Sequence, residues 1–141
     1  MFDSDTAALV IGRPGQGSLT LGMPSRAADG SGMRVPIRIQ VSGVDARSEM
    51  DLESWNGGAG RFCSYLDDLA SSWRGWAGIK EFWDDGANLK IASVHDRVGQ
   101  VILSVTLSPH AGLDQWQLQV GIPIEPGTLQ ALAEAVRAFL V

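Results

Sequence analysis

Two histidines and one cysteine are the residues of this 141-residue chain best suited to acid–base or nucleophilic chemistry. His95 stands beside Asp96 in an expected turn between two strands, and His110 follows Pro109 in another expected loop. A catalytic histidine needs a nucleophile and an orienting group within hydrogen-bond reach, and neighbours in a turn usually point apart. The pattern therefore favours ordinary loop histidines, and an enzyme or small-ligand binder that uses His95 or His110 is only a third hypothesis.

Metal and cofactor sites need ligands at defined spacings, which the sequence does not display. With so few His and Cys, zinc would need carboxylates from distant loops. The glycine clusters at 15–17 and 57–60 lack the Lys and Ser or Thr of a phosphate cradle. Cys63 lies beside the apolar face of an expected helix, so it should be a buried structural thiol. The sequence predicts no catalytic residue, no metal and no cofactor.

Acidic residues gather around one expected helix–strand unit and could form a face that attracts a basic partner, with Trp83 as its anchor. The candidate partner-binding residues are Asp67, Asp68, Glu81, Trp83, Asp84 and Asp85. Asp67 and Asp68 are adjacent on a helix and point apart, so they do not form a catalytic dyad. Asp84-Asp85-Gly86 is typical of a turn. Solvated surface acids are the simpler interpretation, and the sequence leaves open whether these acids converge in space.

The composition is that of a globular protein with an acidic balance. Hydrophobic residues make up 45% of the chain and charged residues 19%, and the formal net charge is −5. A general nucleic-acid binder carries a basic stripe, and none is visible, so no nucleic-acid partner is expected. No stretch approaches the roughly 18 apolar residues of a membrane span. The start lacks the basic region of a signal peptide, and the single Cys63 cannot form an internal disulfide, so we expect a cytoplasmic protein without a membrane partner.

Near the start, Ala7–Ile11 and Ser18–Gly22 should be short strands around a turn at 14–17, and Met23–Gly32 should be a flexible loop. Residues 34–53 have a period of two and should form a hairpin closed by Ser42 and Gly43. The expected pairs are Ile39 with Ala46, Ile37 with Ser48, Val35 with Met50 and Arg34 with Asp51, with Arg38 diagonal to Glu49. Pro36 should place its strand at an edge or mark a bulge.

The first helix should begin near 58–59, with Asn56 as a possible cap, and carry its apolar stripe as far as Trp73. Gly75 should end it as a left-handed residue, with Trp76 as the hydrophobic contact of a Schellman motif. A second helix should begin near Pro126. Its apolar stripe is Leu129, Leu132, Ala133, Val136, Phe139 and Leu140.

The remaining expected strands are Asn88–Val94, Gln100–Leu107, Asp114–Ile122 and a further one at Ile79–Trp83. In the strand at 114–122, Trp116, Leu118 and Val120 should face inward and the glutamines outward. Trp73 and Trp116 should therefore lie in the core, whereas Trp55, Trp76 and Trp83 stand at element ends and should be partly exposed.

These elements predict an α+β fold, with an antiparallel sheet of about six to eight short strands and two amphipathic helices packed on one face. The length predicts one domain over residues 1–141, in which 33–141 form the core and 1–32 form peripheral strands and a loop.

Several motifs stand in a distinctive order: Trp73-Arg74-Gly75-Trp76, Trp83, Leu89-Lys90-Ile91, Gly99–Leu103, Trp116 and a Leu/Ala-rich tail. This order resembles a family of small, uncharacterised actinobacterial proteins with a W-(R/K)-G-W helix end, although Gln100 replaces the commoner His. The resemblance spans Met33–Val141 and implies the architecture, with no site residues to carry over. More weakly, the chain is similar in size and element order to the WapI-type immunity proteins, which neutralise contact-dependent bacterial toxins.

The first functional hypothesis is a non-enzymatic, cytoplasmic protein-binding domain, such as an immunity-type inhibitor whose acidic face blocks a basic, toxin-like partner. The second is a self-associating structural domain, a homodimer paired through the Pro36 edge or through Trp83. A pocket beside His95 or His110 would favour the third, an enzyme or small-ligand binder.

Overall fold

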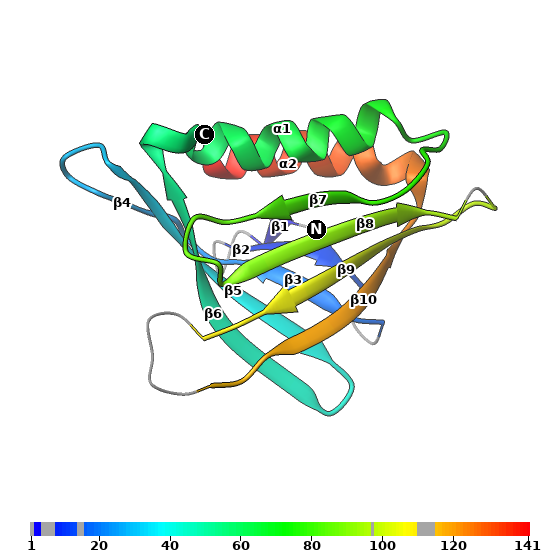
Figure 1. The fold of residues 1–141 in the computed structure, drawn as a ribbon, viewed down its shortest axis with the longest axis horizontal. Coiled ribbons are helices and arrows are strands. Elements are labelled where there is room, and N and C mark those ends of the chain that lie inside the picture. Colours follow the sequence, from blue (N-terminus) through cyan, green and yellow to red (C-terminus); the bar gives the residue numbers. More distant parts are fainter. Residues whose placement is uncertain (1, 4–7, 14–15, 97, 110–114) are drawn as a thin grey trace.

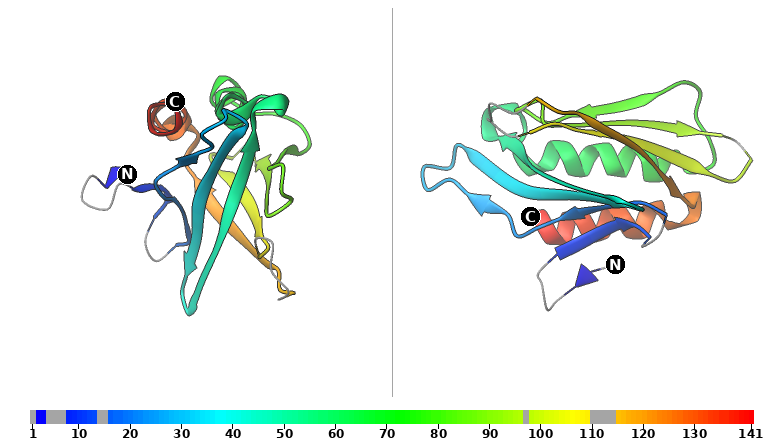
Figure 2. Two further views of the ribbon diagram at one scale, coloured as in Figure 1. Left: turned by 90° about the vertical axis from the view of Figure 1, so that its left-hand side faces the viewer. Right: turned by 90° about the horizontal axis from the view of Figure 1, so that it is seen from below.

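The computed structural model describes residues 2–3, 8–13, 16–96, 98–109 and 115–141, and it confirms the α+β class. In this part of the chain the strands form two antiparallel sheets, and two helices lie side by side along the same side of both (Figures 1 and 2). Two sheets therefore take the place of the single sheet that was expected. Neither described helix is long and apolar enough to cross a membrane.

The first sheet has the order β1-β2-β3-β5-β4, with β6 paired to the other side of β5. Its strands are β1 (Phe2–Asp3), β2 (Ala8–Gly12), β3 (Ser18–Leu21), β4 (Ser25–Arg26), β5 (Gly32–Val41) and β6 (Val44–Glu53). The second sheet has the order β10-β9-β8-β7. Its strands are β7 (Lys80–Trp83), β8 (Leu89–His95), β9 (Val101–Leu107) and β10 (Leu118–Ile124). Two helices and two short 3-10 turns complete the described part of the fold: η1 (Ser54–Asn56), α1 (Gly58–Ser71), η2 (Pro126–Thr128) and α2 (Leu129–Leu140).

The hairpin of β5 and β6 has the expected register throughout, including the pairs Val35–Met50 and Arg34–Asp51. Its strand β5 is not an edge, however, because β3 and β4 pair with one side and β6 with the other. Pro36 lacks a backbone N–H, and it is tolerated there because it lies opposite the gap between β3 and β4. Only its carbonyl takes part in a hydrogen bond on that side, accepting from Gly22 N at 2.7 Å. Arg38 pairs with Arg47 and is thus diagonal to Glu49 as expected, and its guanidinium bonds the other diagonal acid, Asp45.

The N-terminal strands contribute to the core. Leu9, Ile11, Leu19 and Leu21 of β2 and β3 are buried together with the side chains of β5, β8, β9 and the helices. The expected strand residue Ala7 lies outside the described residues. The segment Met23–Gly32, expected to be a flexible loop, contains β4, and its Arg26 donates to the carbonyl of Leu140 at 2.7 Å. This contact ties the segment to the end of α2.

Helix α1 begins at Gly58 as expected but ends earlier, at Ser71. Asn56 does not cap it, since the N-cap residue is Gly57 and no side chain caps the helix there. Because the helix ends before Trp73, this side chain leaves the apolar stripe and is 46% exposed, whereas Trp76 is 8% exposed. The expected placements of these two tryptophans are therefore reversed, and the expected helix end at Gly75 is wrong.

Strand β10 begins at Leu118, so Trp116 precedes the strand and is exposed, contrary to expectation. The expected strand start, Asp114, lies outside the described residues. Helix α2 has the expected apolar stripe, with Phe139 only half-buried. Cys63 is buried as predicted, and burial raises the pKa of its thiol.

Candidate functional site

Asp84 is a buried residue in the turn between β7 and β8, with only 5% of its surface exposed. One carboxylate oxygen accepts hydrogen bonds from Asn88 N at 2.8 Å and Leu89 N at 3.0 Å. The other accepts from Asp51 N on β6 at 2.9 Å and from Gly86 N at 3.3 Å. Four backbone donors thus surround the carboxylate, which explains how a charged group is stabilised inside the protein.

Asp85 continues the same connection. Its carboxylate accepts from Glu53 N at 2.7 Å and from the Asn56 side chain at 2.7 Å, and it lies 3.4 Å from the Arg61 guanidinium. Its own N–H donates to the carbonyl of Asp51 at 2.9 Å. Together, Asp84 and Asp85 bind the backbone of the β6 edge as a neighbouring strand would. We call this pair the aspartate clamp.

Two exposed tryptophans lie on the segments that the aspartate clamp holds together. Trp55 is in η1, next to Asn56, and is 81% exposed; Trp83 ends β7, directly before Asp84, and is 50% exposed. Lys90 Nζ lies 4.7 Å from the centroid of the Trp83 ring, a cation–π contact that orients the ring. We call this region, formed by Trp55, Trp83 and the aspartate clamp, the tryptophan end. The exposure expected for both tryptophans is confirmed.

The other predicted acids are each paired with a base. Asp67 contacts Arg137 of α2, Asp68 lies 2.9 Å from Lys80 Nζ, and Glu81 lies 3.1 Å from Lys90 Nζ. These side chains are about half exposed, so the pairs are solvated and weak. Of the six predicted residues, Glu81 and Trp83 share contact with Lys90 on the outer face of the second sheet, and Asp84 and Asp85 turn inward. The acids do not form one exposed cluster.

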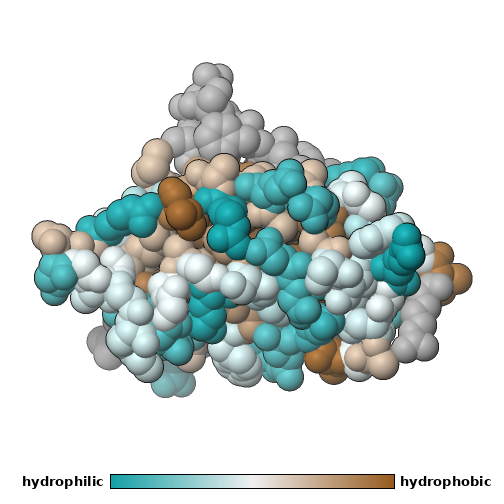
Figure 3. Space-filling view, turned by 90° about the horizontal axis from the view of Figure 1, so that it is seen from above, coloured by the Kyte–Doolittle hydropathy of each residue, from teal (hydrophilic) through white to brown (hydrophobic). Residues whose placement is uncertain are grey.

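Figure 3 looks onto the helix side of the molecule, where hydrophilic residues are spread over much of the surface and strongly hydrophobic ones are scattered. This face does not present a broad apolar patch of the kind that marks a large interface.

His95 is buried at the end of β8. Its Nε2 lies 2.9 Å from the carbonyl oxygen of Trp73, and its ring meets the edge of Trp76 with the centroids 5.3 Å apart. The neighbouring Asp96 instead accepts from the amides of Val98 and Gln100, which lower the pKa of its carboxyl. His95 thus connects the end of α1 to the second sheet. The other candidate, His110, lies outside the described residues.

A partly buried pair of hydroxyl groups links α1 to β8. Tyr65 of α1 donates to the carbonyl of Lys80 at 2.8 Å and also contacts the hydroxyl of Ser93 on β8. Burial raises the pKa of Tyr65 to about 12. The indole of Trp76 donates to the Ser93 carbonyl at 3.3 Å. These contacts join α1 to β7 and β8.

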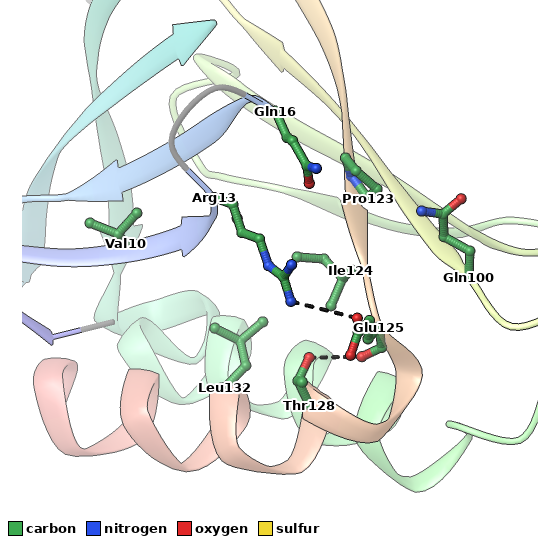
Figure 4. A pocket seen from close by; sticks show the side chains of 10 residues that line it. Val10, Arg13, Gln16, Gln100, Pro123, Ile124, Glu125, Thr128 and Leu132 are labelled. Carbon is green, nitrogen blue, oxygen red and sulfur yellow. Dashed lines mark hydrogen bonds and ion pairs between the residues drawn. The ribbon is translucent and has the colours of Figure 1, made fainter.

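A pocket of about 370 Å³ lies where β2 and β10 meet the start of α2, beside Gln100 (Figure 4). Its mouth carries the ion pair of Arg13 and Glu125, 3.5 Å apart, with the amide of Gln16 nearby. The complete lining is Val10, Gly12, Arg13, Gln16, Gln100, Pro123, Ile124, Glu125, Thr128 and Leu132. Sequence reasoning did not single out any of these as a site residue, because they come from three separate stretches of the chain, 10–16, 100 and 123–132, and together form no motif.

Among the residues that the structure describes, no group of three or more His, Cys, Asp or Glu side chains is arranged to hold a metal ion. The model of the "Family of unknown function (DUF6228)" matches residues 11–141 of the chain. A comparison with curated proteins finds no significant match.

Proposed function

We propose that this chain, which belongs to the DUF6228 family of unknown function, is a non-catalytic domain that binds a protein through its tryptophan end. The observation that carries the proposal is the exposure of Trp55 and Trp83 on segments that the aspartate clamp fixes. Tryptophan is enriched among the few residues that dominate binding energy at protein interfaces.

The aspartate clamp supports this role by reducing the cost of binding. Asp85 joins Asn56 of η1 to the turn after β7, and Asp84 holds the turn itself through buried hydrogen bonds. The backbone that presents the two indoles is therefore ordered before a partner arrives. Association then loses less conformational entropy than it would with flexible loops.

A basic protein is the partner that the charge of the chain favours. The formal net charge is −5, which would attract a cationic surface and speed its association. Because Asp67 and Asp68 are paired with Arg137 and Lys80, this attraction acts through the whole charge distribution more than through one acidic face. An immunity-type inhibitor that blocks a basic toxin domain in the cytoplasm is the specific form of this proposal.

The test compares Trp83→Ser and Trp55→Ser with Trp73→Ser. Trp73 is a matched control because it is 46% exposed, close to the 50% of Trp83, but lies at the other end of α1. A protein captured from the source cells with the wild-type chain would be purified separately and titrated against all four proteins at low and high salt. We expect Trp83→Ser and Trp55→Ser each to weaken binding at least about tenfold, as hot-spot substitutions do, and Trp73→Ser to change it little.

Two outcomes would contradict the proposal. Equal affinities for all three variants would show that the tryptophan end is not the contact surface. An affinity that does not change between low and high salt would exclude a basic partner. Light scattering of the purified chain tests self-association, and a dimer that Trp83→Ser dissociates would make a second copy the partner instead.

A further inference from the structure

The pocket of Figure 4 lies at the other end of the long axis from the tryptophan end, where β10 leads into α2 (Figure 1). Its walls combine two kinds of surface. Val10 of β2, Ile124 of β10 and Leu132 of α2 line it with apolar side chains, whereas Arg13 and Glu125 carry opposite charges at its mouth. Small-molecule sites characteristically pair an apolar lining with a few polar groups that fix the orientation of the ligand.

The charged pair at the mouth is available to a ligand. The Arg13 and Glu125 side chains are 66% and 69% exposed and lie 3.5 Å apart, so their mutual attraction is weak. Figure 4 shows Arg13 and Gln16 reaching over the opening from one side, with Glu125 and Thr128 on the other. The Thr128 hydroxyl donates to the backbone carbonyl of Glu125 at 2.7 Å. This bond fixes the turn that carries Glu125 but leaves its carboxylate free to move.

From this arrangement we infer that the pocket binds a free α-amino acid with a bulky apolar side chain. The α-carboxylate would lie against the Arg13 guanidinium and the ammonium group against the Glu125 carboxylate. A simple anion would be repelled by Glu125 and a simple cation by Arg13, but a zwitterion satisfies both charges at once.

The size and lining of the pocket indicate which kind of amino-acid side chain it would accept. A volume of about 370 Å³ is at the lower end for ligand sites, which suits one amino acid together with ordered water. The apolar side chain would contact Val10, Ile124 and Leu132, and the burial of its surface away from water would contribute to the free energy of binding. Leucine and phenylalanine fit this description better than small or charged amino acids do.

The experiment titrates the intact chain with L-leucine to about 10 mM, which covers millimolar dissociation constants, by calorimetry and heteronuclear NMR. Isocaproate lacks the ammonium group of leucine, and isoamylamine lacks the carboxylate. We expect leucine to shift the amide signals of residues 10–13 and 123–132, and both analogues to bind at least about tenfold more weakly, because each loses one charge-assisted contact. L-Aspartate should not bind.

Charge-removing variants test the assigned contacts. Arg13→Met and Glu125→Gln should each weaken leucine binding about tenfold or more, because each deletes one partner of the zwitterion. Arg47→Met removes a comparable exposed arginine from β6, away from the pocket, and should leave the affinity unchanged. Thermal melts establish that each variant is folded, which is expected because the altered side chains are solvent-exposed.

Three results would overturn the inference. Leucine could fail to shift the pocket signals of the folded wild-type chain. Isocaproate or isoamylamine could bind as tightly as leucine, which would make the site an apolar one with no zwitterion preference. Arg13→Met could bind leucine like Arg47→Met. None of these results bears on the tryptophan end, so the protein-binding proposal would stand or fall separately.

Discussion

Replacement of Asp84 by alanine tests the aspartate clamp directly. The substitution leaves the amides of Asp51, Asn88 and Leu89 without their acceptor in a site that is 5% exposed. A hydrogen bond to a charged group contributes about 1.5–3 kcal/mol, and water entering the vacated space recovers part of that loss. We therefore expect Asp84→Ala to lower the free energy of unfolding by about 3–5 kcal/mol, a large fraction of the total for a domain of this kind.

Urea unfolding followed by tryptophan fluorescence measures this change. With a urea dependence of about 2 kcal/mol per molar, the midpoint should fall by roughly 2 M. The matched control is Asp68→Ala, which removes an exposed carboxylate paired with Lys80 at 2.9 Å and should cost less than about 1 kcal/mol. Asp84→Asn keeps one acceptor oxygen and should fall between the two, because its amide group would face the Asp51 N–H as a second donor.

An Asp84→Ala chain whose stability stays within about 1 kcal/mol of the wild type, or matches that of Asp68→Ala, would show that the aspartate clamp contributes little, since exposed substitutions have effects of that size. Such a result would mean that the three amides find other acceptors or water at little cost. The β6 edge would then not depend on the turn between β7 and β8 for its hydrogen bonds.

Three further predictions concern α1 and the segment that follows it. Trp76→Ala should cost about 3–5 kcal/mol and Trp73→Ala clearly less, because only the first indole is buried; equal losses in urea would contradict the assigned ends of α1. Burial raises the pKa of Tyr65 to about 12, so the unfolded chain loses this proton first, and stability should fall as the pH rises from about 10 to about 12. Tyr65→Phe should flatten that part of the pH profile, and an unchanged profile would assign the loss to other groups. Cys63 is buried and its thiol pKa is raised, so a thiol reagent should modify it only after unfolding; stoichiometric modification of the native chain would show that α1 opens locally.

Local patterns in the sequence were sufficient for much of the architecture. The period of two over 34–53 determined the complete register of β5 and β6, because a slip by one residue would turn the apolar face to water. The apolar stripe of α2 followed from its helical spacing in the same way. Exposure of Trp55 and Trp83 at element ends could also be predicted, and so could the buried thiol of Cys63.

Only the tertiary structure decided which turn residues face inward. Asp84 and Asp85 have the composition of a solvated turn, but each carboxylate also accepts from an amide on β6, 33 residues earlier for Asp84 and 32 for Asp85. Such contacts leave no local pattern, because they arise where two sheets and a helix pack together. The same holds for the end of α1 at Ser71, which reverses the roles of Trp73 and Trp76.

The sequence by itself thus determined the elements whose faces must be buried, since alternation and helical spacing act between near neighbours. It did not determine the division of the strands into two sheets, the inward aspartates, or the pocket that brings Arg13 to Glu125 across more than a hundred residues. Those features depend on which buried faces pack against each other, and that choice is made by the whole core at once.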